Sequence, residues 1–167
     1  MMLDVVGYSK MMSDDESGTL AGLRALRSGV LDPLISKHQG RLVKLIGDGA
    51  LVEFGSVIQA VDCAAAIQSR LTGTAGIKLR IGINLGDVVV DDGDIYGDGV
   101  NVAARLEPLA RPGGVAVSQI VRDQVSHHPR FRFSDGGKHA VKNISEQVHV
   151  FHLLLEGNRC ADHTLTG

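Results

Sequence analysis

The chain has 167 residues, the size of one ordinary domain, and 44% of them are hydrophobic, so a self-sufficient core is expected. The formal net charge of −2 leaves no basic stripe, which argues against a nucleic-acid partner but is compatible with binding of a single nucleotide. Glycine accounts for 21 of the 167 residues, which is well above its average share of about 7%. This excess predicts many tight turns or close backbone approaches to a ligand.

The sequence predicts a cytoplasmic location. No apolar run approaches the roughly 20 residues that span a bilayer, and no charged-then-apolar leader opens the chain, so we expect no membrane contact by this segment. Cys63 and Cys160 lack metal-type spacing and do not resemble a secretory disulfide framework. A reducing cytosol is therefore the expected compartment.

A long amphipathic helix is predicted near the start of the chain. Ser13-Asp14-Asp15-Glu16 is a capping-box pattern, and apolar residues then recur with helical spacing until near Gly40. Pro33 lies inside this helix, where it should kink the helix or divide it in two.

A β-hairpin and a second helix are expected next. The apolar runs 41–46 and 50–54 are joined by Gly47-Asp48-Gly49, which predicts a strand, a turn and a second strand. Ser56 can cap the following helix, whose apolar positions extend to Leu71.

Strands and helices continue to alternate in the second half. Residues 77–83 and 86–90 are interpreted as one long or bent strand, followed by an acidic, glycine-rich turn. The later strands are expected at 115–117, near Phe131 and at 148–155, and the later helices at 100–109 and 118–125. This alternation favours an α/β or α+β sandwich with helices on one mixed sheet. One domain is expected over 1–156, with a loose polar tail at 157–167.

Two carboxylates occupy similar places at the ends of predicted strands. Asp4 follows Met1-Met2-Leu3, and Asp48 stands at the tip of the hairpin between two glycines. If the first strand lies beside the hairpin, the pair can hold two divalent cations, because Mg²⁺ is usually bound by one or two carboxylates plus substrate phosphates. Gly-Asp-Gly is also an ordinary turn sequence, so the pattern alone leaves both interpretations open.

A possible phosphate-binding loop follows Asp4. Val6, Gly7, Tyr8 and Ser9 connect a strand end to a helix start, and the glycine allows backbone amides to face outward. Such N–H groups can bind a triphosphate. Strand-to-helix turns with one glycine are common, so the pattern alone does not distinguish a phosphate-binding loop from an ordinary connection.

The stretch 94–105 is the most informative in the chain. Asn101 and Arg105 are four residues apart and share one helical face, while Val102 and Leu106 point toward the core. A solvated surface would explain such a polar pair. The functional alternative is that Arg105 neutralises charge on a phosphoryl group and Asn101 orients a ribose.

Four ordered segments together resemble the signature blocks of class III adenylate and guanylate cyclases, especially bacterial ones. They are Asp4-Val-Val-Gly-Tyr-Ser, Val43-Lys-Leu-Ile-Gly-Asp-Gly49, Leu79-Arg-Ile-Gly-Ile-Asn-Leu-Gly86 and Asp94-Ile-Tyr-Gly-Asp-Gly-Val-Asn-Val-Ala-Ala-Arg105. The resemblance covers residues 3–155. It implies an α+β fold with the ferredoxin-like βαββαβ core of cyclases and polymerase palms, in which helices pack on a mixed, mostly antiparallel sheet. It also implies head-to-tail homodimers with active sites at the subunit interface.

The resemblance also implies roles for individual residues. Asp4 and Asp48 would bind two Mg²⁺ or Mn²⁺ ions, and Lys44 and Asp94 would recognise the purine. Asn101 would bind the ribose, Arg105 would stabilise the transition state, and Lys142 would bind the triphosphate. Two departures stand out. Only three residues precede Asp4, and Asp87 stands where some family members place a phosphate-binding arginine.

The activity that the resemblance implies is conversion of ATP to 3′,5′-cyclic AMP and pyrophosphate. A lysine donor and an aspartate acceptor match N1 and the 6-amino group of adenine. Guanine reverses both groups, although a shifted ring would still satisfy the same pair. The family pattern, in which lysine and aspartate mark adenylate cyclases, favours ATP. The alternatives are a guanylate cyclase and an inactive nucleotide-binding or dimerisation module, and regulatory domains are expected elsewhere in the full-length protein.

Overall fold

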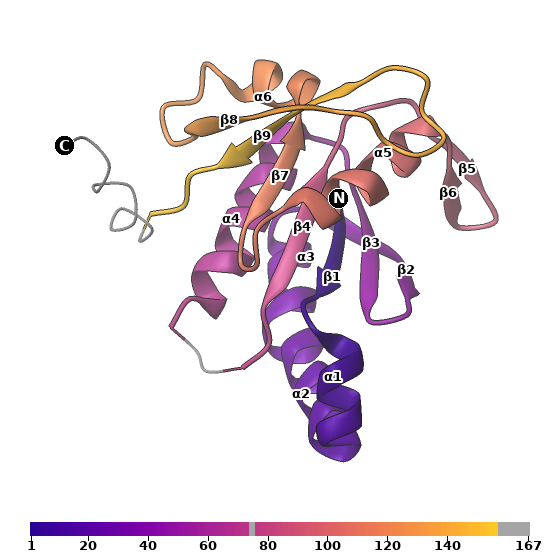
Figure 1. Ribbon diagram of the computed structural model, residues 1–167, viewed down its shortest axis with the longest axis vertical. Helices are drawn as coiled ribbons and strands as arrows, with labels where there is room; N and C mark the ends of the chain where they lie inside the picture. Colours follow the sequence, from indigo (N-terminus) through magenta and orange to yellow (C-terminus); the bar gives the residue numbers. More distant parts are fainter. Residues whose placement is uncertain (74–75, 157–167) are drawn as a thin grey trace.

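The computed structural model describes residues 1–73 and 76–156, which form a layered α+β structure around one large sheet (Figure 1). The sheet has seven strands in the order β2-β3-β1-β4-β7-β9-β8. These strands are β1 (Met2–Val5), β2 (Gly40–Ile46), β3 (Gly49–Phe54), β4 (Leu79–Ile83), β7 (Val115–Ser118), β8 (Phe133–His139) and β9 (Val148–Leu153). A second, two-stranded sheet consists of β5 (Val89–Asp91) and β6 (Asp94–Tyr96).

The first four strands of the large sheet form the expected core. β1 lies between β3 and β4 and is antiparallel to both, and β2 pairs antiparallel with β3. Helices connect β1 to β2 and β3 to β4, which gives the chain order βαββαβ. Among the strands of residues 1–73 and 76–156, only β4 and β7 pair in parallel. The prediction of an α+β fold with a mostly antiparallel sheet is therefore confirmed.

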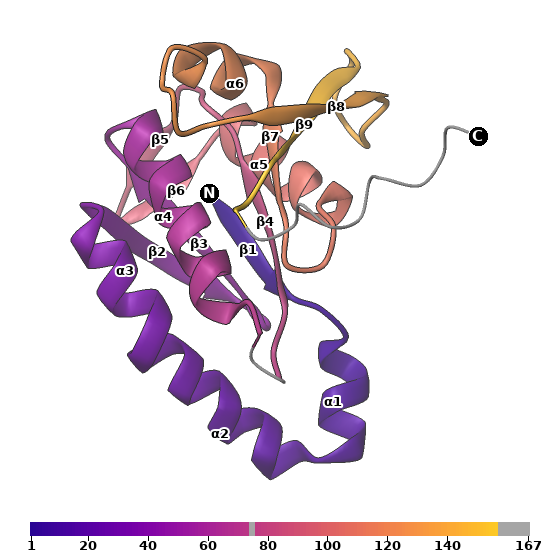
Figure 2. The same cartoon turned by 90° about the vertical axis from the view of Figure 1, so that its left-hand side faces the viewer.

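Helices cover both faces of the sheet, as the two views show (Figures 1 and 2). The main core lies between one face and the helices α2 (Glu16–Leu26), α3 (Asp32–Lys37), α4 (Val57–Leu71) and α6 (Gln119–Val125). A smaller cluster on the other face includes Leu106, Ala116 and Val150, beneath α5 (Asp98–Leu106) and the short η2 (Glu107–Leu109). Among the helices of the described residues, none is long and apolar enough to cross a bilayer.

The long N-terminal helix is divided more finely than expected. A first helix, α1 (Tyr8–Asp14), precedes it, and Asp15 rather than Ser13 caps α2 by accepting a hydrogen bond from the Gly18 amide at 3.0 Å. The capping-box prediction was wrong because Ser13 lies within α1, where its hydroxyl donates to the Ser9 carbonyl. The division expected at Pro33 is present, as a π-helical segment, η1 (Arg27–Leu31), directly before α3. Proline supplies no amide to the helix ladder, so a local change of helix type fits its position.

The prediction of one long strand over 77–90 was wrong. β4 ends at Ile83, and the chain then passes so close to the start of α5 that a Cβ on Gly86 would lie 3.0 Å from the Cα of Gly99. β5 belongs instead to a small hairpin with β6, whose turn contains Asp92 and Gly93 at φ 49 and 78. Positive φ at both central positions is the geometry of a tight hairpin turn.

The β2–β3 hairpin and α4 agree with the sequence prediction. β2 and β3 pair from Gly40↔Phe54 to Ile46↔Gly49, and Gly47 in the turn has φ 59, which glycine adopts without strain. Ser56 caps α4, because its side chain accepts a hydrogen bond from the Gln59 amide. The polar tail predicted at 157–167 lies outside the described residues.

Candidate active site

Asp4 and Asp48 lie together at one end of the central strands. Asp4 is in β1 and Asp48 is in the turn between β2 and β3, and the pairing of β1 with β3 brings the two elements together. Gly49 makes the close approach possible, because a Cβ there would lie 2.5 Å from the Leu3 carbonyl and 3.2 Å from the Asp4 carboxyl. The two carboxylates that the sequence placed at strand ends are thus neighbours.

The environment of the pair favours a proton or a cation. Partial burial raises the pKa of Asp4 from 3.8 to about 6, and a hydrogen bond and charge repulsion from Asp48 add to the shift. In the described part of the chain, no cluster of three or more histidine, cysteine or acidic side chains has metal-binding geometry. Two adjacent carboxylates still fit Mg²⁺ or Mn²⁺, since these ions take their remaining ligands from water and substrate phosphates.

The loop after β1 offers fewer free amides than the sequence suggested. The Val6 amide donates to the Lys78 carbonyl at 2.9 Å, so it is not available to a ligand. Gly7 is the N-terminal cap of α1 and has φ 70, which turns the chain into the helix. Tyr8 and Ser9 occupy the first turn of α1, where helix amides have no partner within the helix.

Lys44 and Asp94 form an ion pair within one protomer. The Lys44 ammonium lies 2.8 Å from Oδ2 of Asp94, and it also lies 5.5 Å from the centre of the Tyr96 ring. The other oxygen, Oδ1 of Asp94, accepts a hydrogen bond from the Ile95 amide at 2.7 Å. The pair lowers the pKa of Asp94 and raises that of Lys44, chiefly through their mutual hydrogen bond. A donor and an acceptor therefore stand side by side on a partly exposed surface.

Asn101 and Arg105 are both exposed on α5, as the helical spacing predicted. Val102 is partly buried and Leu106 is fully buried against the sheet. Within residues 1–73 and 76–156, neither polar side chain has a hydrogen bond or an ion pair, and neither contacts Asp4 or Asp48 in this way. The structure therefore does not join these two residues to the carboxylate pair of the same chain.

Lys142 and Asp87 lie in connecting segments. Lys142 is exposed between β8 and β9, beside Asn143, which has φ 65. Asp87 is exposed between β4 and β5, before the small hairpin. Among the residues that the structure describes, neither side chain has an ion-pair partner, so the fold leaves both free to meet a ligand or a second subunit.

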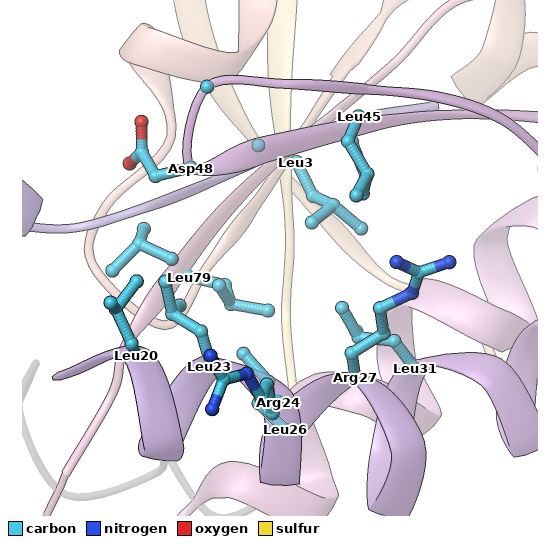
Figure 3. Close-up of a pocket in the computed structure, with 14 residues that line it drawn as sticks. Leu3, Leu20, Leu23, Arg24, Leu26, Arg27, Leu31, Leu45, Asp48 and Leu79 are labelled. Carbon is cyan, nitrogen blue, oxygen red and sulfur yellow. The ribbon is translucent and has the colours of Figure 1, made fainter. Parts of the chain in front are cut away.

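An apolar cavity of about 200 Å³ opens between α2 and the β2–β3 hairpin, with Asp48 at its rim (Figure 3). Leucine side chains from α2, β1 and β4 line most of it, and Arg24 and Arg27 extend toward it. Leu3 and Val5 face this cavity, so Asp4 projects from the opposite face of β1, because side chains alternate along a strand. The cavity is therefore not the place where the carboxylate pair meets a ligand.

Two charged residues near the pair were missed at the sequence level. Arg80 stands opposite Asp4 in the pairing of β1 with β4. Glu107 at the start of η2 is only 8% exposed, and its pKa is raised to about 7 by burial first and then by the charge of Asp4. The signals were a charged residue within an apolar strand and an acidic residue directly after the apolar Leu106.

Comparisons with known sequences and structures show which family the chain belongs to. The family described as "Adenylate and Guanylate cyclase catalytic domain" matches residues 1–155. "Putative adenylate cyclase 3" from Rhizobium meliloti is 49% identical over 155 residues, which are 89% of this chain and 26% of that protein. A pH-sensitive adenylate cyclase from Mycobacterium tuberculosis is 30% identical over 156 residues, 89% of this chain and 38% of that protein. The chain thus spans less than half the length of either relative.

Solved structures give the same result. An adenylate/guanylate cyclase/hydrolase from Silicibacter pomeroyi superposes with a TM-score of 0.85 at 38% identity, covering 92% of this chain and 94% of that chain. The adenylyl cyclase CyaB from P. aeruginosa shares the fold, with a TM-score of 0.78 at 22% identity and coverage of 92% and 91%. On these matches, the chain belongs to the family of adenylate and guanylate cyclase catalytic domains.

Proposed function

We propose that this chain is the catalytic domain of an adenylate cyclase, which converts ATP to 3′,5′-cyclic AMP and pyrophosphate. The observation that carries the choice of ATP is the Lys44–Asp94 pair, with 2.8 Å between the ammonium and the carboxylate. Adenine offers an acceptor at N1 and a donor at its 6-amino group, which match a lysine and an aspartate. Both relatives named above are adenylate cyclases by their names, which supports the same choice.

The carboxylate pair is the proposed cation site. Asp4 and Asp48 would hold two Mg²⁺ or Mn²⁺ ions with the phosphates of the substrate. Bound there, the ions supply a lowered pKa for the attacking 3′-hydroxyl and charge neutralisation for the triphosphate. Asp4 carries one role of its own: because its pKa is raised to about 6, protons would compete with the cation for this carboxylate at and below that pH.

The remaining polar residues orient the nucleotide and stabilise charge. Asn101 would hold the ribose so that the 3′-hydroxyl is in line with the α-phosphorus. Arg105 would donate hydrogen bonds to the non-bridging oxygens of the pentacovalent phosphorus, where negative charge develops. Lys142 would offset charge on the leaving pyrophosphate, together with the amides of Gly7, Tyr8 and Ser9.

We place the complete active site between two copies of the chain. Asn101 and Arg105 are exposed and lack a contact with Asp4 or Asp48 in the described chain. In a head-to-tail homodimer, one protomer supplies the two carboxylates and its partner supplies Lys44, Asp94, Asn101 and Arg105. Exposed apolar side chains at Val89, Val90 and Tyr96, each more than half exposed, support a partner surface beside the Lys44–Asp94 pair.

The alternatives have less support. Against an inactive nucleotide-binding or dimerisation module stands the intact set of Asp4, Asp48, Asn101 and Arg105. A guanylate cyclase would need the purine to shift so that the same lysine and aspartate meet reversed groups. Regulatory domains are expected outside this segment, elsewhere in the full-length protein.

One assay tests the proposal directly. The purified chain is incubated with Mn²⁺ or Mg²⁺ and either ATP or GTP, and the cyclic product is identified by chromatography and mass. Cyclic AMP should form from ATP, and far less cyclic GMP should form from GTP. A preference for GTP would contradict the assignment of the base, and no product from either nucleotide at high protein concentration would contradict the activity.

A further inference from the structure

A third carboxyl group lies behind the Asp4–Asp48 pair. β1 and β4 pair antiparallel with Asp4 directly opposite Arg80 and Met2 opposite Gly82. Directly opposed residues of an antiparallel pair have side chains on the same face of the sheet. Arg80 and Gly82 therefore face the same side as Asp4, which is the side covered by α5 and η2.

Close packing fixes η2 against this face. A Cβ on Gly82 would lie 2.5 Å from the amide nitrogen of Glu107, so a side chain at position 82 would push η2 away. Arg80 adds a second attachment, because its Nε donates to the Ala110 carbonyl at 3.0 Å. η2 contacts both β4 and β1, and Glu107 is its first residue. The backbone thus holds Glu107 beside the strand that carries Asp4.

Glu107 has no structural partner that would explain its burial. Glu107 is 8% exposed as a whole residue, and no hydrogen bond or ion pair of its side chain is found in the described ranges. Its carboxylate oxygens keep some contact with solvent, since they are not among the fully buried unpaired polar atoms of these ranges. Burial has the largest effect on the pKa of Glu107, and the charges of Asp4, Arg80 and Asp48 follow in that order. Holding a largely buried carboxylate beside other carboxylates with no hydrogen-bond partner is unfavourable, and a residue held in that way is a candidate for function rather than for stability.

We propose that Glu107 is a positioning residue for the cations, a third carboxylate that strengthens divalent-cation binding at Asp4 and Asp48 through its negative charge. The proposal rests on the proposed function, because it requires that the Asp4–Asp48 pair binds cations. Glu107 itself does not ligate the ions. Arg80 stands among the three carboxyl groups and offsets part of their repulsion when no cation is bound. Residues behind a metal site commonly tune the affinity of the ligands in this way.

Mn²⁺ titration of the purified chain tests this inference, with the electron paramagnetic resonance signal of free Mn²⁺ as the readout. Glu107→Gln keeps the size of the side chain and removes its charge, and it should weaken Mn²⁺ binding by about 10-fold. Glu107→Asp keeps the charge and should retain most of the affinity. Glu16→Gln removes an equal charge from an exposed position at the start of α2 and should leave Mn²⁺ binding unchanged.

Thermal unfolding in EDTA at pH 8 separates this role from a structural one. Removing an unpaired buried charge should raise the melting temperature of Glu107→Gln, whereas loss of a structural contact would lower it. With Mn²⁺ and ATP, the variant should need more Mn²⁺ for half-maximal rate but reach a similar rate at saturation. A lower melting temperature together with unchanged Mn²⁺ affinity would overturn the inference.

The same titration distinguishes the two proposals. If the wild type binds Mn²⁺ and Asp4→Asn abolishes the binding, the proposed cation site is supported. If Glu107→Gln then binds Mn²⁺ with unchanged affinity, only the proposed role of Glu107 is rejected. If the wild type shows no Mn²⁺ binding that depends on Asp4, both the cation site and the role of Glu107 are rejected.

Discussion

The Lys44 ammonium and the Asp94 carboxylate are 2.8 Å apart although 50 positions separate them in the sequence. The contact joins β2 of the large sheet to β6 of the small hairpin. Arg41 strengthens the same junction, because it donates to the Gly93 carbonyl at 2.9 Å and pairs with Glu53. The small hairpin is thus attached to the large sheet by side chains, and the pair proposed to read the base lies at the junction.

The first prediction concerns the choice of base. The double variant Lys44→Glu, Asp94→Cys should lose far more kcat/KM for ATP than for GTP, because mismatched polar groups in a base site stay unpaired and reject the wrong ring by up to about 10⁴. The measurement is kcat/KM with each nucleotide at saturating Mn²⁺. Arg130→Ala is the matched control, since it removes another partly exposed ion pair, with Asp62 at 3.0 Å, and should change neither value.

The second prediction concerns the cation site. Asp48→Ala should lower the turnover rate by about 10³ or more, because several kcal/mol of transition-state stabilisation are lost with the cation. Asp48 lies in an accessible turn, so the fold should persist, and circular dichroism with a thermal melt checks this. Turnover close to wild type in the folded variant would contradict the assignment of Asp48.

The third prediction follows from the raised pKa of Asp4, which is about 6 in the folded chain instead of 3.8. Because the folded state holds this proton more tightly, its contribution to stability is present below pH 4 and is lost as the pH rises through 6. Asp4→Asn should therefore raise the melting temperature in EDTA at pH 8 and have little effect at pH 4. Equal effects at both pH values would show that Asp4 is not titrating in this range.

Much of the fold could be predicted because local signals agreed with the tertiary structure. The β2–β3 hairpin has apolar runs on both sides of Gly47-Asp48-Gly49, and α4 has a capping serine followed by helical periodicity. The cap of α2 could not be predicted in the same way. Ser13 and Asp15 are both good capping residues, and the choice depends on where α1 ends.

Some residues of the candidate site could likewise be predicted from the sequence, and others could not. Asp4, Asp48 and Asn101 could be selected from residue type and spacing, because they stand at strand ends, in a turn or on one helical face. The sequence signals at Arg80 and Glu107 did not point to the carboxylate pair, since the position of both residues beside it depends on strand register and on burial. The three-residue strand β6 was too short to show periodicity, so the contact between Lys44 and Asp94 also required the folded chain.

The last prediction tests the composite site with two variants, Asp48→Ala and Arg105→Ala. If each active site takes Asp48 from one protomer and Arg105 from the other, both variants should be nearly inactive alone. When the two proteins are mixed and exchange subunits, one site of each mixed dimer collects both lesions and the other site is intact. Random pairing makes half of the dimers mixed, with half of their sites working, so activity should recover to about a quarter of wild type. Cyclic AMP production is measured before and after mixing, and differently tagged subunits verify the exchange. If exchanged dimers stay inactive, the site lies within one protomer, and the separation of Arg105 from the carboxylate pair then has to be closed by movement of α5.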